Sequence, residues 1–72
     1  MKQFCYEVGG FEFIDTVAFG TAWKEAKAKA AEMHVAIYRV IRKDGEEKTE
    51  VFCTGGCFIR ADLAEPKNIK IF

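Results

Sequence analysis

The sequence predicts an α+β domain: a mainly antiparallel sheet, made of two β-hairpins and a short C-terminal ribbon, with one α-helix packed across one face, in the order ββαββ(β)β. Alternating runs of residues flank Gly9-Gly10 and Asp44-Gly45, and such two-residue turns are typical of hairpins. Between the hairpins, residues 16–34 carry apolar side chains at helical spacing. Together the two turns and the helical stretch define the fold class.

Composition indicates one domain that spans residues 1–72. Half of the residues are apolar, only one is proline, and no linker or repeat interrupts the chain. A chain this short buries only about 60% of the surface that its unfolded form exposes. Seven phenylalanines, two tyrosines and one tryptophan supply large side chains for that burial. We therefore expect the aromatic residues to form the core.

Residues 2–15 form the first predicted hairpin, and the Gly9-Gly10 turn sets its register. Val8 then faces Phe11 and Tyr6 faces Phe13, so one side of the ribbon is aromatic and must be covered. The opposite side is expected to be mostly wet and carries Gln3, Cys5, Glu7, Glu12 and Ile14.

The predicted helix covers the aromatic side of that hairpin. Its N-cap is expected at Asp15 or Thr16, although Gly20 weakens the first turn, so that the regular helix begins nearer Thr21. The apolar stripe comprises Phe19, Trp23, Ala26, Ala30 and Met33.

Residues 35–54 form the second predicted hairpin. In the register that Asp44-Gly45 imposes, Arg42 faces Glu47 and Arg39 faces Glu50, two pairs of opposite charge. This register also pairs Tyr38 with Val51 and Ala36 with Cys53. The side toward the helix is expected to carry Ala36, Tyr38, Val40, Val51 and Cys53, and the opposite side Val35, Ile37, Ile41 and Phe52 among the charged Arg39, Lys48 and Glu50.

The C-terminal ribbon contains three short predicted elements. Residues 57–60 are expected to form a strand, and residues 62–65 a brief capped turn. Residues 68–72 alternate apolar and polar side chains, which predicts a last strand at a sheet edge or paired with the first strand near Phe4 and Tyr6.

Charge and length restrict the function classes. Eleven basic and eleven acidic residues cancel, whereas nucleic-acid binders usually carry a basic excess. The N-terminus has no apolar core of signal-peptide length, and no apolar run reaches the length of a membrane span, about 18 residues. We expect a cytoplasmic protein with no membrane contact, and its size alone suggests a bacterial or phage genome.

Protein–protein contact is the favoured function. The second hairpin is expected to expose an apolar strip with two charges on its outer face, and such strips mark interfaces, either with a second copy or with another protein. We call the six residues of this candidate interface the hairpin strip: Val35, Ile37, Arg39, Ile41, Glu50 and Phe52. The alternative is that the C-terminal ribbon folds over this face.

Nucleic-acid binding is an alternative hypothesis. Basic residues occur on both the helix and the second hairpin, with aromatic residues near by. The candidate residues are Lys24, Lys27, Lys29, Arg39, Arg42 and Lys43.

A zinc or thiol protein is the second alternative. Cys53 and Cys57 have a spacing that zinc sites use, but a closed site needs four ligands, and the remaining candidates are Cys5 and His34. The structural alternative is that Cys53 is a small buried residue and Cys57 a strand residue after the turn. An odd number of cysteines without a secretion signal indicates reduced thiols.

Enzymatic activity is not expected. Neither the G-x-S-x-G elbow nor the phosphate-binding G-x-x-x-x-G-K-[ST] loop occurs, and the chain has one histidine. Glu7 and Glu12 face each other but are typical of a solvated hairpin. The sequence therefore favours a small non-catalytic binding or regulatory module without a cofactor.

Overall fold

The computed structural model describes residues 2–72 as a five-stranded antiparallel sheet with one α-helix, which confirms the α+β prediction. The elements, in chain order, are β1 (Gln3–Val8), β2 (Phe11–Asp15), α1 (Thr21–Met33), β3 (Tyr38–Lys43), β4 (Glu46–Phe52), β5 (Phe58–Arg60) and the short 3-10 helix η1 (Pro66–Asn68).

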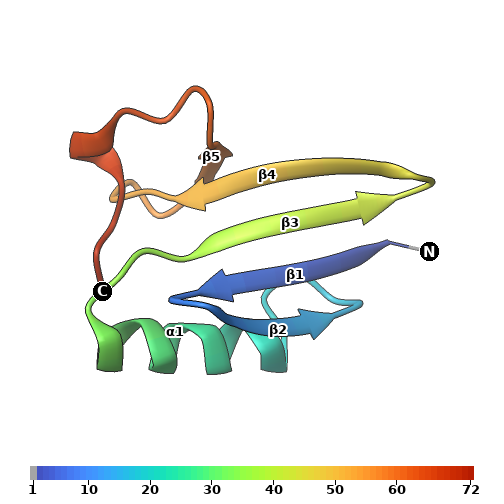
Figure 1. Ribbon diagram of the computed structural model, residues 1–72, viewed down its shortest axis with the longest axis horizontal. Helices are drawn as coiled ribbons and strands as arrows, with labels where there is room; N and C mark the ends of the chain where they lie inside the picture. Colours follow the sequence, from blue (N-terminus) through green and yellow to red (C-terminus); the bar gives the residue numbers. More distant parts are fainter. Residues whose placement is uncertain (1) are drawn as a thin grey trace.

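The strands are ordered β2-β1-β3-β4-β5, so β2 forms one edge of the sheet and β1 lies beside β3. In Figure 1 the helix follows the β1–β2 side, and the tip of the β3–β4 hairpin extends beyond it. Both hairpin registers agree with the sequence prediction, because Tyr6 pairs with Phe13 and Arg39 pairs with Glu50. Each register is set by a local turn.

The faces of the second hairpin are the reverse of those predicted. Phe4 pairs with Ile41 and Tyr6 pairs with Arg39, and cross-strand partners point to the same face of a sheet. The odd-numbered residues of β3 therefore share the helix side with the aromatic residues of β1. Tyr38, Val40, Val51 and Cys53, which were expected beneath the helix, lie on the opposite side, which we call the open face.

The core lies between α1 and the aromatic side of β1, as predicted. Trp23, Ala26 and Ala30 are buried against Phe4, Tyr6 and Val8. Tyr6 is fully buried, and its hydroxyl oxygen accepts a hydrogen bond from the backbone N–H of Phe19 at 3.2 Å. The other two members of the predicted stripe are more exposed: Phe19 precedes the helix with its ring against Trp23, and Met33 is 38% exposed.

The residues of the first hairpin on the open face, which were expected to be mostly wet, differ in exposure. Glu12 and Ile14 are exposed there, but Cys5 is fully buried. The thiol of Cys5 donates to Glu12 Oε2 at 3.4 Å, and burial, followed by this hydrogen bond, raises its pKa. Val40, Val51 and Cys53 are also buried on this face, so part of the open face is shielded from water.

Helix α1 begins at Thr21, as expected, but its N-cap is Gly20 rather than Asp15 or Thr16. Asp15 still provides an acceptor for a free N–H group in the first turn of the helix. Its Oδ2 accepts a hydrogen bond from the N–H of Ala22 at 3.2 Å. Its other oxygen accepts from the N–H groups of Thr16 and Val17. The loop from β2 to α1 therefore closes on one carboxylate.

Stability should depend on the charge of Asp15. The N–H of Ala22, then those of Val17 and Thr16, hold the pKa of this carboxyl below its ordinary value. A lowered folded-state pKa adds stability above the unfolded pKa, about 4, and this contribution is lost as pH falls through the folded value. Asp15→Asn should be less stable than wild type in urea at pH 7, with the difference shrinking at pH 3. An equal difference at both pH values would contradict this role.

The C-terminal residues do not form the predicted last strand. After η1, Ile69 makes a single bridge with Cys53, and the N–H of Lys70 donates to the carbonyl of Phe52. The N–H of Phe72 then donates to the carbonyl of Val35. The segment crosses the ends of β4 and β3 and reaches the connection after α1 (Figure 1), so it pairs neither with β1 nor along a sheet edge.

Candidate functional site

The hairpin strip is not an exposed surface, so that part of the prediction is wrong. Ile37 is fully buried in the core. Val35, Ile41 and Phe52 are half-buried and pack against the core on the helix side. The pairing of β1 with β3 turned this strip inward, and the C-terminal ribbon contributes Phe72 to its cover, with the Phe72 ring 5.7 Å from that of Phe52.

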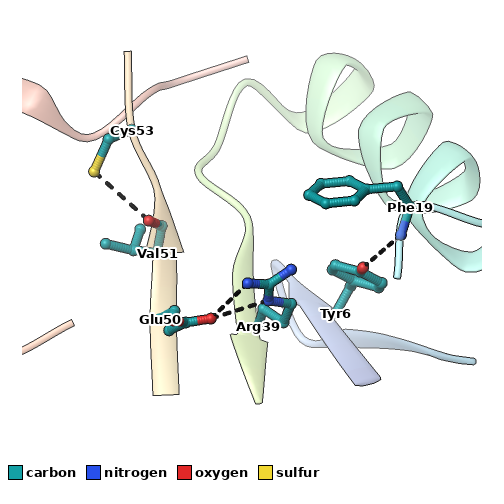
Figure 2. Close-up of polar contacts among 6 residues, drawn as sticks. All are labelled: Tyr6, Phe19, Arg39, Glu50, Val51 and Cys53. Carbon is teal, nitrogen blue, oxygen red and sulfur yellow. Dashed lines mark hydrogen bonds and ion pairs between the residues drawn. The ribbon is translucent and has the colours of Figure 1, made fainter. Parts of the chain in front are cut away.

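The two charged residues of the strip form a partly buried ion pair (Figure 2). Arg39 donates to Glu50 Oε1 from Nη2 at 2.7 Å and from Nε at 3.1 Å. The side chains are only 11% and 19% exposed. The guanidinium also lies 3.9 Å from the centre of the Phe58 ring, so its charge is neutralised and its flat face is covered.

The six basic residues of the nucleic-acid alternative do not form one surface. Arg42 lies on the face of the sheet opposite Arg39 and donates to Glu47 at 2.6 Å. On the helix, Lys29 pairs with Glu32 at 3.2 Å and Lys27 lies over the Trp23 ring. The remaining two candidates, Lys24 and Lys43, are exposed on the helix and at the tip of β3.

The zinc alternative is not assembled within the described residues. Among residues 2–72, no group of three or more histidine, cysteine, aspartate or glutamate side chains is placed to hold a metal ion. Cys5 lies in β1, His34 ends α1, and Cys53 and Cys57 flank the β4–β5 turn. Only the last two lie next to each other.

The free edge of the sheet is formed by β2. The two-residue Gly9-Gly10 turn makes Val8–Phe11 a hydrogen-bonded pair. Along the hairpin such pairs alternate with pairs that exchange no hydrogen bond, and Glu12 and Ile14 belong to the second kind. The N–H and C=O groups of Glu12 and Ile14 therefore point away from β1. Within residues 2–72 they have no hydrogen bond to another element.

Large apolar side chains accompany these unpaired backbone groups. Phe11 is 49% exposed, Ile14 is 55% exposed, and Val17, just beyond the strand, is 58% exposed. We call Phe11, Glu12, Ile14 and Val17 the β2 edge. A shallow hollow on the open face, lined by Glu7, Phe11, Glu12 and Tyr38 among others, adjoins it.

The opposite side of the sheet is protected differently. There β5 covers only Glu50–Phe52 of β4, and the uncovered part of β4 carries the charges Glu46, Glu47 and Lys48. Charges on an edge strand discourage pairing with another chain. Strand β2 has no proline or lysine, and of its two carboxylates only Glu12 is free of backbone hydrogen bonds, since Asp15 accepts from the N–H groups of Thr16 and Ala22. Of the two strands β2 and β4, β2 is therefore better suited to pairing with another chain.

Sequence reasoning missed the β2 edge because strand order decides which strand is outermost. One signal was present: Ile14 stands among Glu7 and Glu12 on a side predicted to be wet. An apolar β-branched residue on a solvated strand is a reason to look for a partner.

Comparisons with protein-family models, curated proteins and solved structures found no match. No helix among residues 2–72 has the length and apolar character required to cross a bilayer.

Proposed function

We propose that the chain is a small non-catalytic binding module that associates with a second copy of itself through the β2 edge. The observation that carries the proposal is the coincidence of unpaired backbone groups at Glu12 and Ile14 with the exposed side chains of Phe11, Ile14 and Val17. An exposed apolar edge strand is a template for pairing with another strand.

A two-fold axis at Phe13 gives the most favourable register. Two antiparallel β2 strands then place Glu12 of each copy opposite Ile14 of the other, and these outward-pointing residues exchange both of their hydrogen bonds. Phe13 meets its own counterpart at a position where side chains approach closely. No like charges are opposed, whereas an axis at Glu12 would set two carboxylates against each other.

Size also supports self-association. A domain of 72 residues has a small core, and joining two sheets into one adds buried surface without a disulfide or metal. The proposal includes a cytoplasmic location, which rests on the odd number of cysteines. Nucleic-acid binding has less support, because Arg39 and Arg42 are already paired on opposite faces.

A charge on the β2 edge should abolish the dimer. Ile14→Glu places a carboxylate opposite Glu12 of the partner, and the two-fold axis repeats this like-charge pair, while the 55% exposed side chain can be replaced without loss of the core. The matched control is Leu63→Glu, at a side chain that is 65% exposed outside the sheet. Sedimentation across a protein concentration series should show a dimer for wild type and Leu63→Glu, and a monomer for Ile14→Glu.

A substitution that acts on the backbone hydrogen bonding of β2 distinguishes a dimer formed by edge-to-edge strand pairing from one formed by packing of two sheet faces. The N–H of Glu12 points outward, so Glu12→Pro removes a donor to the partner without removing a bond to β1. A folded monomer by circular dichroism and sedimentation is expected. A monomeric wild type, or a dimer that persists in both Ile14→Glu and Glu12→Pro, would reject the proposal.

A further inference from the structure

The turn between β4 and β5 brings two cysteines opposite each other. Cys53 donates its backbone N–H to the carbonyl of Cys57 at 2.9 Å, and the N–H of Gly56 donates to the carbonyl of Cys53 at 3.0 Å. Gly56 has a φ of 84°, so the loop is a type I turn followed by a left-handed glycine. Cys53 and Cys57 are therefore the closing pair of a three-residue hairpin loop.

Both side chains of this pair point to the open face. The preceding pair, Phe52 and Phe58, points to the helix side with ring centres 5.1 Å apart, and successive pairs alternate between faces. Hydrogen-bonded cross-strand residues have Cα atoms about 5.5 Å apart. This lies within the range that a disulfide bridges, about 4.4–6.8 Å.

The two thiols differ in access. Cys53 is 2% exposed, and its thiol donates to the carbonyl of Val51 at 3.6 Å (Figure 2), whereas Cys57 is exposed. Burial, and secondarily the nearby Cys57, raises the pKa of the Cys53 thiol. A bulky oxidant therefore meets Cys57 first, and Cys53 is held beside it as the second thiol.

The loop can adjust to a covalent link. A methyl group added at Gly55 or Gly56 would meet no atom within 4 Å, so open space surrounds both residues. The neighbouring Thr54 is tied to the C-terminal segment by a hydrogen bond from its N–H to the carbonyl of Asn68 at 2.7 Å. Closing the loop would thus fix the point at which that segment meets the sheet.

We propose that Cys53 and Cys57 form a reversible dithiol–disulfide site whose substrate is a low-molecular-weight disulfide such as oxidised glutathione. The Cys57 thiolate attacks one sulfur of the oxidant, which breaks its S–S bond and releases one reduced glutathione. The Cys53 thiolate then attacks Cys57 Sγ, which forms the protein disulfide and releases the second. Two protein thiols are oxidised, one oxidised glutathione is reduced, and the two protons pass to the released glutathione thiolates, which become thiols.

This site is independent of the proposed dimer. The β2 edge and the β4–β5 turn lie at opposite ends of the strand order, so failure of either proposal leaves the other intact. Cys5 provides an internal control, because it is fully buried in β1, away from the turn.

The test is the thiol state of the full chain in glutathione buffers of increasing oxidised fraction. After equilibration the protein is denatured in N-ethylmaleimide and its intact mass is measured. Wild type should change from three labelled cysteines to one, and trypsin should release residues 49–60 as a peptide lighter by two hydrogens. Three labels at every ratio, a mixed disulfide on Cys57 that persists, or a disulfide-linked dimer would each overturn the proposal.

Single variants assign the order of attack. Cys53→Ser should stop at a glutathione adduct on Cys57, and Cys57→Ser should leave Cys53 unmodified in the folded protein. Because Cys57 is exposed, Cys57→Ser keeps the test valid if Cys53→Ser fails to fold. Cys5→Ala should oxidise at the same glutathione ratio as wild type, and rapid modification of Cys53 in Cys57→Ser would contradict the order.

Discussion

Trp23→Ala is expected to lower the free energy of unfolding by about 3–5 kcal/mol, the cost of removing a large buried aromatic side chain. The Trp23 ring is 7% exposed and lies 5.1–5.5 Å, centre to centre, from four other rings. These belong to Tyr6, Phe19, Phe52 and Phe58. Its removal therefore opens a cavity between α1, β1, β4 and β5 together.

The size of the domain makes this loss severe. Small domains have total stabilities of about 5–15 kcal/mol, and a 72-residue chain belongs near the lower end. Urea unfolding followed by far-UV circular dichroism should show that Trp23→Ala keeps only about 0–2 kcal/mol of stability at 25 °C, so that it unfolds at low urea concentration. Leu63→Ala, at an exposed side chain, should change stability by less than about 0.5 kcal/mol. Similar losses in the two variants would contradict the assignment of Trp23 to the centre of the core.

Sequence patterns predicted the parts of the fold that depend on neighbours along the chain. The Gly9-Gly10 and Asp44-Gly45 turns fixed two registers, and both are confirmed. The start of the helix at Thr21 followed from the cost of Gly20 in a helix interior. In each case the deciding interaction spans only a few residues.

The faces of the second hairpin could not be read in this way. Both sides of β3 carry apolar residues, so alternation alone does not say which side meets the helix. The pairing of Phe4 with Ile41 decides it, and these residues are far apart in sequence. An error of one residue in that pairing exchanges the two faces of a strand, which is why the hairpin strip was placed outside.

The candidate site depended on the same missing information. The β2 edge exists because β3 pairs with β1 on the side away from β2, a fact of topology. By contrast, the Cys53–Cys57 pair was visible as a spacing, and its three-residue loop shows how the two residues face each other. The local motif was thus predictable from the sequence, whereas the exposed surface, which depends on strand order, was not.

Glu50→Leu is expected to cost about 3–5 kcal/mol, because it leaves the Arg39 guanidinium buried without its carboxylate. The Arg39 and Glu50 side chains are 11% and 19% exposed, and Phe58 covers one face of the guanidinium. Water cannot readily replace Glu50 there. The free energy of unfolding, measured in urea, should fall accordingly.

The same hairpin supplies a matched control. Arg42 and Glu47 form the equivalent cross-strand pair at 2.6 Å, but their side chains are 43% and 59% exposed. Exposed pairs contribute about 0–1 kcal/mol, so Glu47→Leu should have a small effect. Equal losses in Glu50→Leu and Glu47→Leu would show that burial does not determine the strength of these pairs.

A double variant distinguishes the attraction between the charges from the cost of leaving one of them alone. Replacing a buried ion pair by apolar residues of similar volume is often neutral or stabilising. Arg39→Met combined with Glu50→Leu should therefore recover most of the stability that Glu50→Leu loses, since no charge remains under Phe58. If the double variant were as unstable as the single one, the ion pair itself would be a net source of stability. Recovery would instead mean that Arg39 and Glu50 require each other without strengthening the fold, because the aromatic core around them supplies the stability.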